Sequence, residues 1–272
     1  MSGAFPDFVF AALLAVLTVG GTVALAIGSY LLGRKLLLPL SGEETRDLAG
    51  SVIFRVSALH GLILALVFAE EIVNVNGIKQ TTSRESALIA DIYYDLKRYE
   101  PEQTAALRTE LATYVALVVN DEWRELAENR RLSAAAWDRW STVYSGILDL
   151  APQTPRQVRL QETLQAEIRE ISRLRRQREN AALSSVNPFF MAAAVIGVVL
   201  TSLSFFTFAP TTVNLVLLSV FGIYTGMIIF FVTAFSNPYL PPGAIEPVGF
   251  QQLFQGEVRA DYEASLDGST VR

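Results

Sequence analysis

Two long apolar stretches, a polar block of roughly 110 residues and two further apolar stretches follow one another along the chain. The apolar stretches cover residues 5–32, 52–75, 189–208 and 213–235. Because a helix of about 20 apolar residues spans the hydrocarbon core of a bilayer, each stretch is long enough to cross it. The pattern predicts an all-α, polytopic membrane protein with four transmembrane helices and a helical domain inserted between spans two and three.

The polar block has helical periodicity, since its apolar residues recur at intervals of three and four. We predict helices over residues 78–99, 101–130, 134–148 and 156–183, with Ser133 as an N-cap. Residues 236–256 are rich in proline and glycine and predict an extended strap, and the chain from Ala260 onward predicts disorder. The predicted domains are therefore transmembrane helices one and two (1–75), a helical cytoplasmic domain (76–186), transmembrane helices three and four (187–236) and a strap with a disordered tail (237–272).

The positive charges predict the orientation, because arginine and lysine near span ends remain in the cytoplasm. Three flank the connection after span one, namely Arg34, Lys35 and Arg46, whereas seven flank the polar block. The polar block and both termini are therefore expected on the cytoplasmic side. Arg34 and Lys35 favour the opposite orientation, because they lie directly at the end of span one.

Composition excludes several kinds of function. The formal net charge is −5, and no basic stripe with interleaved aromatic residues indicates nucleic-acid binding. The absence of cysteine excludes disulfides and thiolate chemistry, and a single histidine excludes a histidine cluster within one subunit. No phosphate-binding glycine loop, metal-ligand spacing or nucleophile motif is found. We predict no enzymatic activity, no catalytic residues, no bound metal and no cofactor.

Span two contains ionisable residues. At about 100° per residue, one narrow helix face carries His60, Ile63, Val67, Glu71 and Asn74, with Glu70 on its edge. Ionisable groups inside a span are costly and usually face a bundle interior or a wet cavity. One interpretation is a pore, with an apolar constriction and an acidic ring that favours cations. The alternative is structural: the glutamates reach headgroup water, and the histidine bonds to a neighbouring helix.

Two further groups predict packing and lipid contact. Small residues at four-residue spacing predict close helix approach in the other spans, at Gly20, Ala24, Gly28, Ala193, Gly197, Gly222 and Gly226. An arginine run near span three is typical of a solvated helix end, with contact to anionic lipid headgroups as the functional alternative, at Arg173, Arg175, Arg176 and Arg178.

Several short motifs resemble the bestrophin-like domain family. They are the Leu62–Phe68 stretch followed by Glu70, the helix Ser83–Ala90, the helix start at Pro101 and the turn Asn237–Ile245. The similarity covers most of residues 51–256 and includes the order of two spans, a helical insert, two spans and a strap.

The resemblance implies a pentamer in a bacterial inner membrane, with an apolar neck from span two formed by Ile63, Val67 and either Leu64 or Phe68. The sequence departs from true bestrophin anion channels in two respects. It lacks an acidic calcium clasp after span four and a phenylalanine-rich neck. Calcium gating and anion selectivity are therefore not expected.

Two functions remain open at this point. The first is an oligomeric ion channel or pore whose span two lines the axis, with the lipid bilayer, other copies of the chain and inorganic ions as partners. The second is a non-conducting membrane scaffold or sensor whose cytoplasmic helices bind a partner protein. A pore requires the span-two residues to line a continuous axial path, whereas a scaffold buries them within one subunit or leaves the axis plugged by lipid.

Overall fold

The protein is all-helical in the part of the chain described by a computed structural model, namely residues 4–42, 45–184, 186 and 188–269. The predicted boundary at residue 187 and residues 270–272 of the predicted tail lie outside this part. The chain divides into two units. We call them the apolar unit (Met1–Asn74, Ser185–Ser236 and Pro241–Gly243) and the polar unit (Val75–Ser184, Asn237–Leu240 and Ala244–Arg272).

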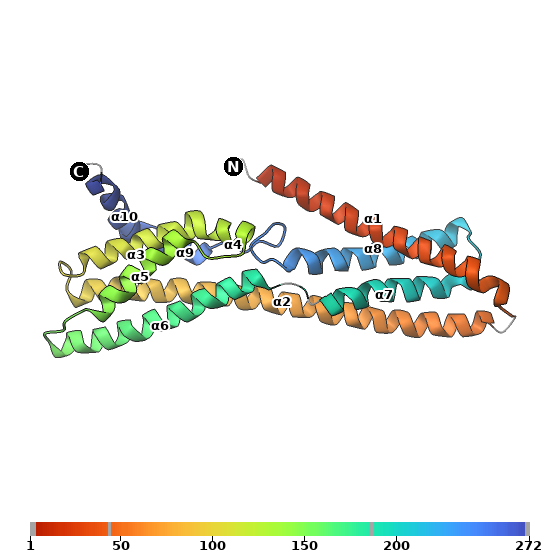
Figure 1. The fold of residues 1–272 in the computed structure, drawn as a ribbon, viewed down its shortest axis with the longest axis horizontal. Coiled ribbons are helices and arrows are strands. Elements are labelled where there is room, and N and C mark those ends of the chain that lie inside the picture. The colour runs from red at the N-terminus through yellow and green to blue at the C-terminus, as the bar shows by residue number, and fades with distance from the viewer. Residues whose placement is uncertain (1–3, 43–44, 185, 187, 270–272) are drawn as a thin grey trace. The chain divides into compact units, whose positions relative to one another are not determined.

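The apolar unit contains α1 (Ala4–Leu37), the first part of α2 (Thr45–Tyr99), α7 (Pro188–Ser204) and α8 (Thr212–Phe235), together with the short 3-10 helices η1 (Leu38–Leu40) and η3 (Phe205–Thr207) (Figure 1). Among the described residues, four helices are long and apolar enough to cross a membrane. In α2 the apolar residues lie in the first half of the helix. The third apolar run lies in α7, whereas α6 is rich in arginine and glutamate. The predicted fold class is confirmed.

Small residues on α8 allow α1 to approach closely. A Cβ atom added at Gly222 would lie 2.9 Å from the Cα of Val23, and one added at Gly226 would lie 2.8 Å from the Cα of Val19. These distances are shorter than real Cβ contacts, so the two helices approach closely at both glycines. By contrast, the predicted stripe of Gly20, Ala24 and Gly28 on α1 is exposed. That stripe therefore contributes little to packing within the described chain.

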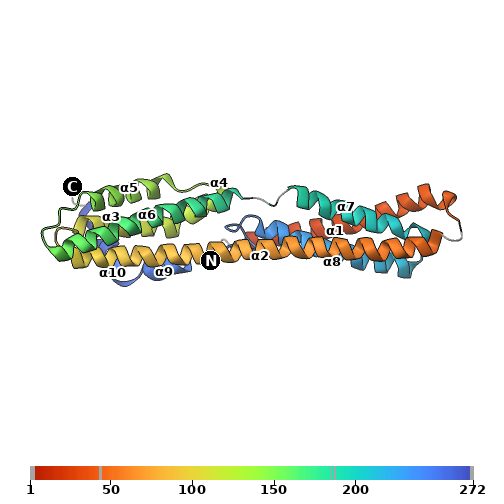
Figure 2. The same cartoon turned by 90° about the horizontal axis from the view of Figure 1, so that it is seen from below.

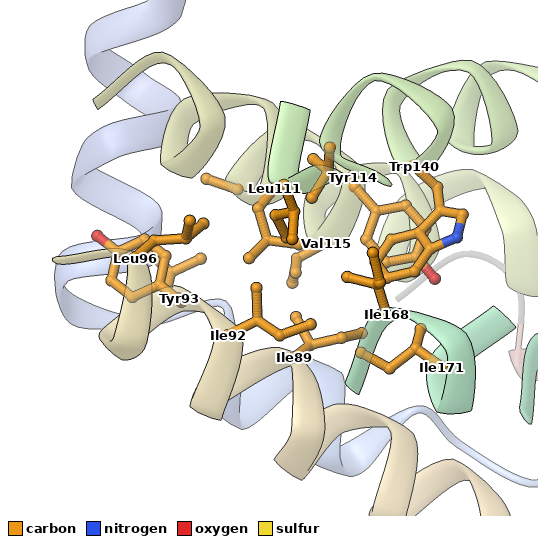
Figure 3. Close-up of a cluster of buried hydrophobic side chains, with 14 of the residues drawn as sticks. Ile89, Ile92, Tyr93, Leu96, Leu111, Tyr114, Val115, Trp140, Ile168 and Ile171 are labelled. Carbon is orange, nitrogen blue, oxygen red and sulfur yellow. The ribbon is translucent and has the colours of Figure 1, made fainter. Parts of the chain in front are cut away.

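The polar unit contains the second half of α2, α3 (Ala105–Leu117), the π-helical turn η2 (Val118–Glu122), α4 (Trp123–Asn129), α5 (Ala134–Leu148), α6 (Pro155–Leu183), α9 (Val248–Leu253) and α10 (Gly256–Ser269). Figure 2 shows α5 alongside α6, and the two helices are in contact. The main cluster of buried side chains comes mostly from α2, α3, α5 and α6, and those labelled in Figure 3 point toward one another. Phe250 of α9 and Val258 of α10 also belong to it.

Local sequence signals explain the helix boundaries. The Ser133 hydroxyl accepts a hydrogen bond from the Ala136 amide at 3.4 Å and caps α5 at the predicted position. Thr154 and Gln157 form a reciprocal capping box at the start of α6. The predicted start at Pro101 is wrong by one turn, because residues 101–104 form a turn and α3 begins at Ala105.

The C-terminal segment is more ordered than predicted. The predicted disorder from Ala260 is wrong for the described residues, because α10 continues to Ser269. Val258 is buried, the rings of Phe254 and Tyr262 lie 5.4 Å apart, and Tyr93 donates a 2.8 Å hydrogen bond to Asp261. Packing against the polar unit therefore stabilises a helix whose composition alone favours a flexible tail.

Candidate functional site

The predicted face of span two is divided in the structure. His60, Leu64 and Val67 are 3, 4 and 7 % exposed and face the neighbouring helices of the same chain. Phe68 and Glu71 are half-buried. The exposed members of the predicted set are Ile63, Glu70 and Asn74. The expected common face is therefore not one surface.

The buried side of α2 packs on α7 and α8. His60 lies directly over Gly197, since a Cβ at that glycine meets the imidazole ring, and its ring centroid is 6.1 Å from that of Phe221. Leu64 joins Ala194 and Ile229 in a small apolar cluster. Gly197 thus lies in close contact with the single histidine of the sequence. Among the described residues, neither ring nitrogen of His60 has a hydrogen-bond partner.

The exposed side of α2 is broad, since it also includes Leu62 and Ile72, and one line of residues through Glu70 runs along it. Its members recur at intervals of three and four and therefore share one helix face, which we call the Glu70 stripe: Leu59, Ile63, Leu66, Glu70 and Val73. Within the described residues no ion pair involves Glu70. A carboxylate on an apolar span is thus presented outward without an ion-pair partner among the described residues.

A second constellation lies inside the polar unit and joins four ionisable residues, which we call the charge cluster: Glu85 of α2, Glu122 of η2, and Arg175 and Arg178 of α6. All four side chains are fully enclosed. Arg175 Nη2 donates to Glu122 Oε2 at 2.8 Å, and Arg178 pairs with the other oxygen of Glu122. Arg178 Nη1 also lies 3.4 Å from Glu85 Oε2. Two carboxylates therefore balance two guanidinium groups.

Aromatic rings enclose the charge cluster. The Arg175 guanidinium lies 5.0 Å from the centroid of Tyr114 and 5.3 Å from that of Trp137. The Arg178 guanidinium lies 5.1 Å from the Trp123 ring and 5.4 Å from the Phe250 ring. Such cation–π contacts become stronger when water is excluded. They explain how two arginines remain inside an otherwise apolar core.

The charge cluster also positions two tyrosine hydroxyls. Tyr114 donates to Glu85 Oε1 at 3.2 Å, and Tyr239 donates to the Arg178 carbonyl at 3.1 Å. Burial raises the pKa of both tyrosines, so they remain neutral donors. Burial alone disfavours a charged arginine, but the carboxylates of Glu85 and Glu122 outweigh it and raise the pKa of Arg178. The cluster is therefore a fixed ionic crosslink between α2, η2 and α6.

The location of these charges differs from the sequence-based expectation. Arg173 and Arg176 are exposed, as predicted, but the expected surface position is wrong for Arg175 and Arg178. Glu122 is also buried, at 0 % exposed. Sequence reasoning missed Glu85 altogether. The spacing of these residues could have indicated their burial, because each of the four continues an apolar stripe of its helix.

Glu122 lies at the end of the π-helical turn η2. A π turn holds one more residue than an α turn, and such bulges occur frequently at functional sites. Val118 and Glu122, at the two ends of η2, are both buried, while Asn120 between them is exposed.

No group of three or more carboxylate or histidine side chains in the described part of the chain could hold a metal ion.

The model of the bestrophin-like domain matches residues 3–250. A crystal structure of a membrane protein is similar over 92 % of this chain and 97 % of its own, with a TM-score of 0.55 and 10 % sequence identity. At that identity the likeness concerns the fold alone. No curated protein matches the sequence significantly.

Proposed function

The chain belongs to the bestrophin-like domain family, and from this membership we propose that it forms an oligomeric pore for inorganic ions. The Glu70 stripe of α2 lines the axis of this pore. The observation that carries the proposal is the outward-facing Glu70, an ionisable side chain on an apolar span with no ion-pair partner among the described residues. Such a group is costly against lipid and is tolerated beside a water-filled cavity or another subunit.

The composition of the stripe supports a preference for cations. Ile63 and Leu66 supply an apolar constriction, and Glu70 supplies one carboxylate per subunit. A ring of carboxylates attracts cations, and an apolar collar can close by losing water. Glu71, half-buried beside the stripe, adds to the same negative field. Phe68 borders the opposite, buried side, where its ring lies 6.3 Å from that of Phe231.

We further propose the membrane arrangement. The polar unit and both termini face the cytoplasm of a bacterial cell, because the positive charges at the span ends favour this side. Five copies surround the axis, as the family resemblance implies. The exposed Arg173 and Arg176 remain candidates for contact with anionic headgroups. No enzymatic step and no nucleic-acid partner form part of this proposal.

A second candidate is a non-conducting scaffold or sensor. The burial of His60, Leu64 and Val67 within one subunit favours it, because a wide axial path lined by the whole predicted face is incompatible with that burial. In this case the exposed surface of α2 contacts another subunit or a partner helix, and Glu70 pairs across that contact. The polar unit then carries the activity.

Imaging the protein in a gentle detergent distinguishes the two candidates. The pore proposal expects a closed ring of subunits with the Glu70 stripe of every α2 facing the symmetry axis. Liposomes containing the protein should then take up potassium when a gradient is applied. A ring in which α2 faces lipid, or an assembly without flux, contradicts the pore and favours the scaffold.

A further inference from the structure

A cavity of about 350 Å³ lies between α5 and α6 in the polar unit. From α5 it is lined at three- and four-residue intervals by Trp137, Trp140, Ser141 and Tyr144. From α6 it is lined with the same periodicity by Arg169, Ser172 and Arg176. Residues at this spacing share one helix face, so an aromatic stripe on α5 faces a cationic stripe on α6.

The cavity carries two positive charges that are not compensated locally. Arg169 and Arg176 are exposed, and neither forms an ion pair with another described residue. By contrast, Arg173 on the same helix pairs with Glu170 at 2.6 Å and lies outside the cavity. Seven residues separate the two lining arginines, which places their backbone positions about 10 Å apart along the helix. The cavity therefore favours an anion.

The aromatic wall is held in place by the core. Trp140 Nε1 donates to Ser172 Oγ at 3.1 Å, and this hydroxyl donates to the Ile168 carbonyl at 2.9 Å. Trp140 is 1 % exposed, whereas Trp137 is 46 % exposed and presents a large apolar surface to the cavity. The lining is thus formed before any ligand arrives, which reduces the entropy cost of binding.

We infer that this cavity binds a small planar aromatic acid. The ring of the ligand stacks against Trp137 and Tyr144, and its carboxylate or other oxyanion pairs with Arg169 or Arg176. Guanidinium groups bind carboxylates in bidentate geometry, and aromatic pairs gain affinity beyond the area they bury. The volume falls in the range of small-molecule sites, about 300–1,000 Å³. This inference does not depend on ion conduction by the apolar unit.

Isothermal titration of the full chain in detergent with 2-naphthoate tests the inference. We expect saturable binding with one site per chain and none for the neutral 2-naphthylmethanol. Arg169→Gln combined with Arg176→Gln should weaken binding at least tenfold. Trp137→Ala should also weaken it at least tenfold, and thermal unfolding of this variant is measured in parallel because the ring also contacts Arg175. Arg173→Gln is the matched control and should bind as the unmodified protein does.

Three outcomes overturn the inference: no saturable binding of 2-naphthoate, equal binding by the double arginine variant, or an equal loss in Arg173→Gln. The last result indicates a general charge effect of α6, as a lipid-headgroup surface produces. Inorganic phosphate binding as tightly as 2-naphthoate contradicts the aromatic part of the site. The titrations test the cavity whether or not the protein conducts potassium, so a negative flux test contradicts the pore alone.

Discussion

At the scale of single residues, the charge cluster is the place where one substitution has the largest expected effect. Glu122→Ala leaves Arg175 and Arg178 buried with one remaining carboxylate, Glu85. Removing one partner of a buried pair costs about 3–5 kcal/mol, which predicts a fall of roughly 10 °C in the thermal unfolding midpoint. Glu110→Ala is the control, because it breaks the surface pair with Arg139 and should shift the midpoint by only a few degrees. Equal shifts in both variants contradict a structural role for the cluster.

Glu167 gives a pH dependence, also at the residue scale. Burial, together with the charges of Asp91 and Asp95, raises the pKa of this half-buried carboxyl to about 7. The folded state therefore binds this proton more tightly than the unfolded chain, whose glutamate titrates near 4.5. The stabilisation is complete below about pH 4.5 and is lost as the pH rises through about 7.

Glu167→Gln, which cannot ionise, should raise the thermal midpoint at pH 8 relative to the unmodified protein. It should have little effect at pH 4.5. Glu162→Gln changes an exposed glutamate on the same helix and is the matched control. The difference in thermal midpoint between Glu167→Gln and the unmodified protein is compared at the two pH values. If it is the same at both, titration of Glu167 is not its cause.

At the scale of elements, the extra residue of η2 determines how α3 and α4 fit the core. Deleting Asn120 removes one residue from the turn and rotates Glu122 by about 100° relative to α3. The carboxylate then leaves the two arginines, and we expect a loss of stability at least as large as that of Glu122→Ala. Asn120→Ala keeps the length of the turn and changes an exposed side chain, so its thermal midpoint should stay within a few degrees of the unmodified protein. A stable deletion variant shows that η2 is dispensable.

The same elements show what the sequence could and could not predict. The α5 boundary was predictable, because a serine N-cap precedes a helical run. The charge cluster was not predicted, because charged residues usually mark solvated faces. On α6, however, Arg175 and Arg178 continue the buried stripe of Leu164, Ile168 and Ile171 at the same spacing. For a charged residue in register with an apolar stripe, the helical position therefore predicts burial in an ion pair. The residue type, which predicts exposure, is the weaker guide.

For the whole molecule, the four membrane helices were predictable because the bilayer imposes their length and composition. The rotation of α2 was not, because it depends on which neighbour accepts its bulky side chains. Gly197 leaves room for His60, so this residue faces α7, and the exposed remainder of the helix surface includes the Glu70 stripe. Periodicity defines the faces of a helix, whereas packing decides which face is free.

The free face of α2 leads to a prediction for the assembled protein. If Glu70 lines the axis, Glu70→Gln removes one negative charge per subunit from the conduction path. A unit charge about 4 Å from an ion in water contributes about 1 kcal/mol, so the potassium-to-chloride permeability ratio should fall about fivefold or more. Glu71→Gln removes the same charge from a half-buried position and should change the ratio less. Reversal potentials in planar bilayers under a potassium chloride gradient measure both variants, and a ratio that is unchanged in Glu70→Gln places this carboxylate outside the path.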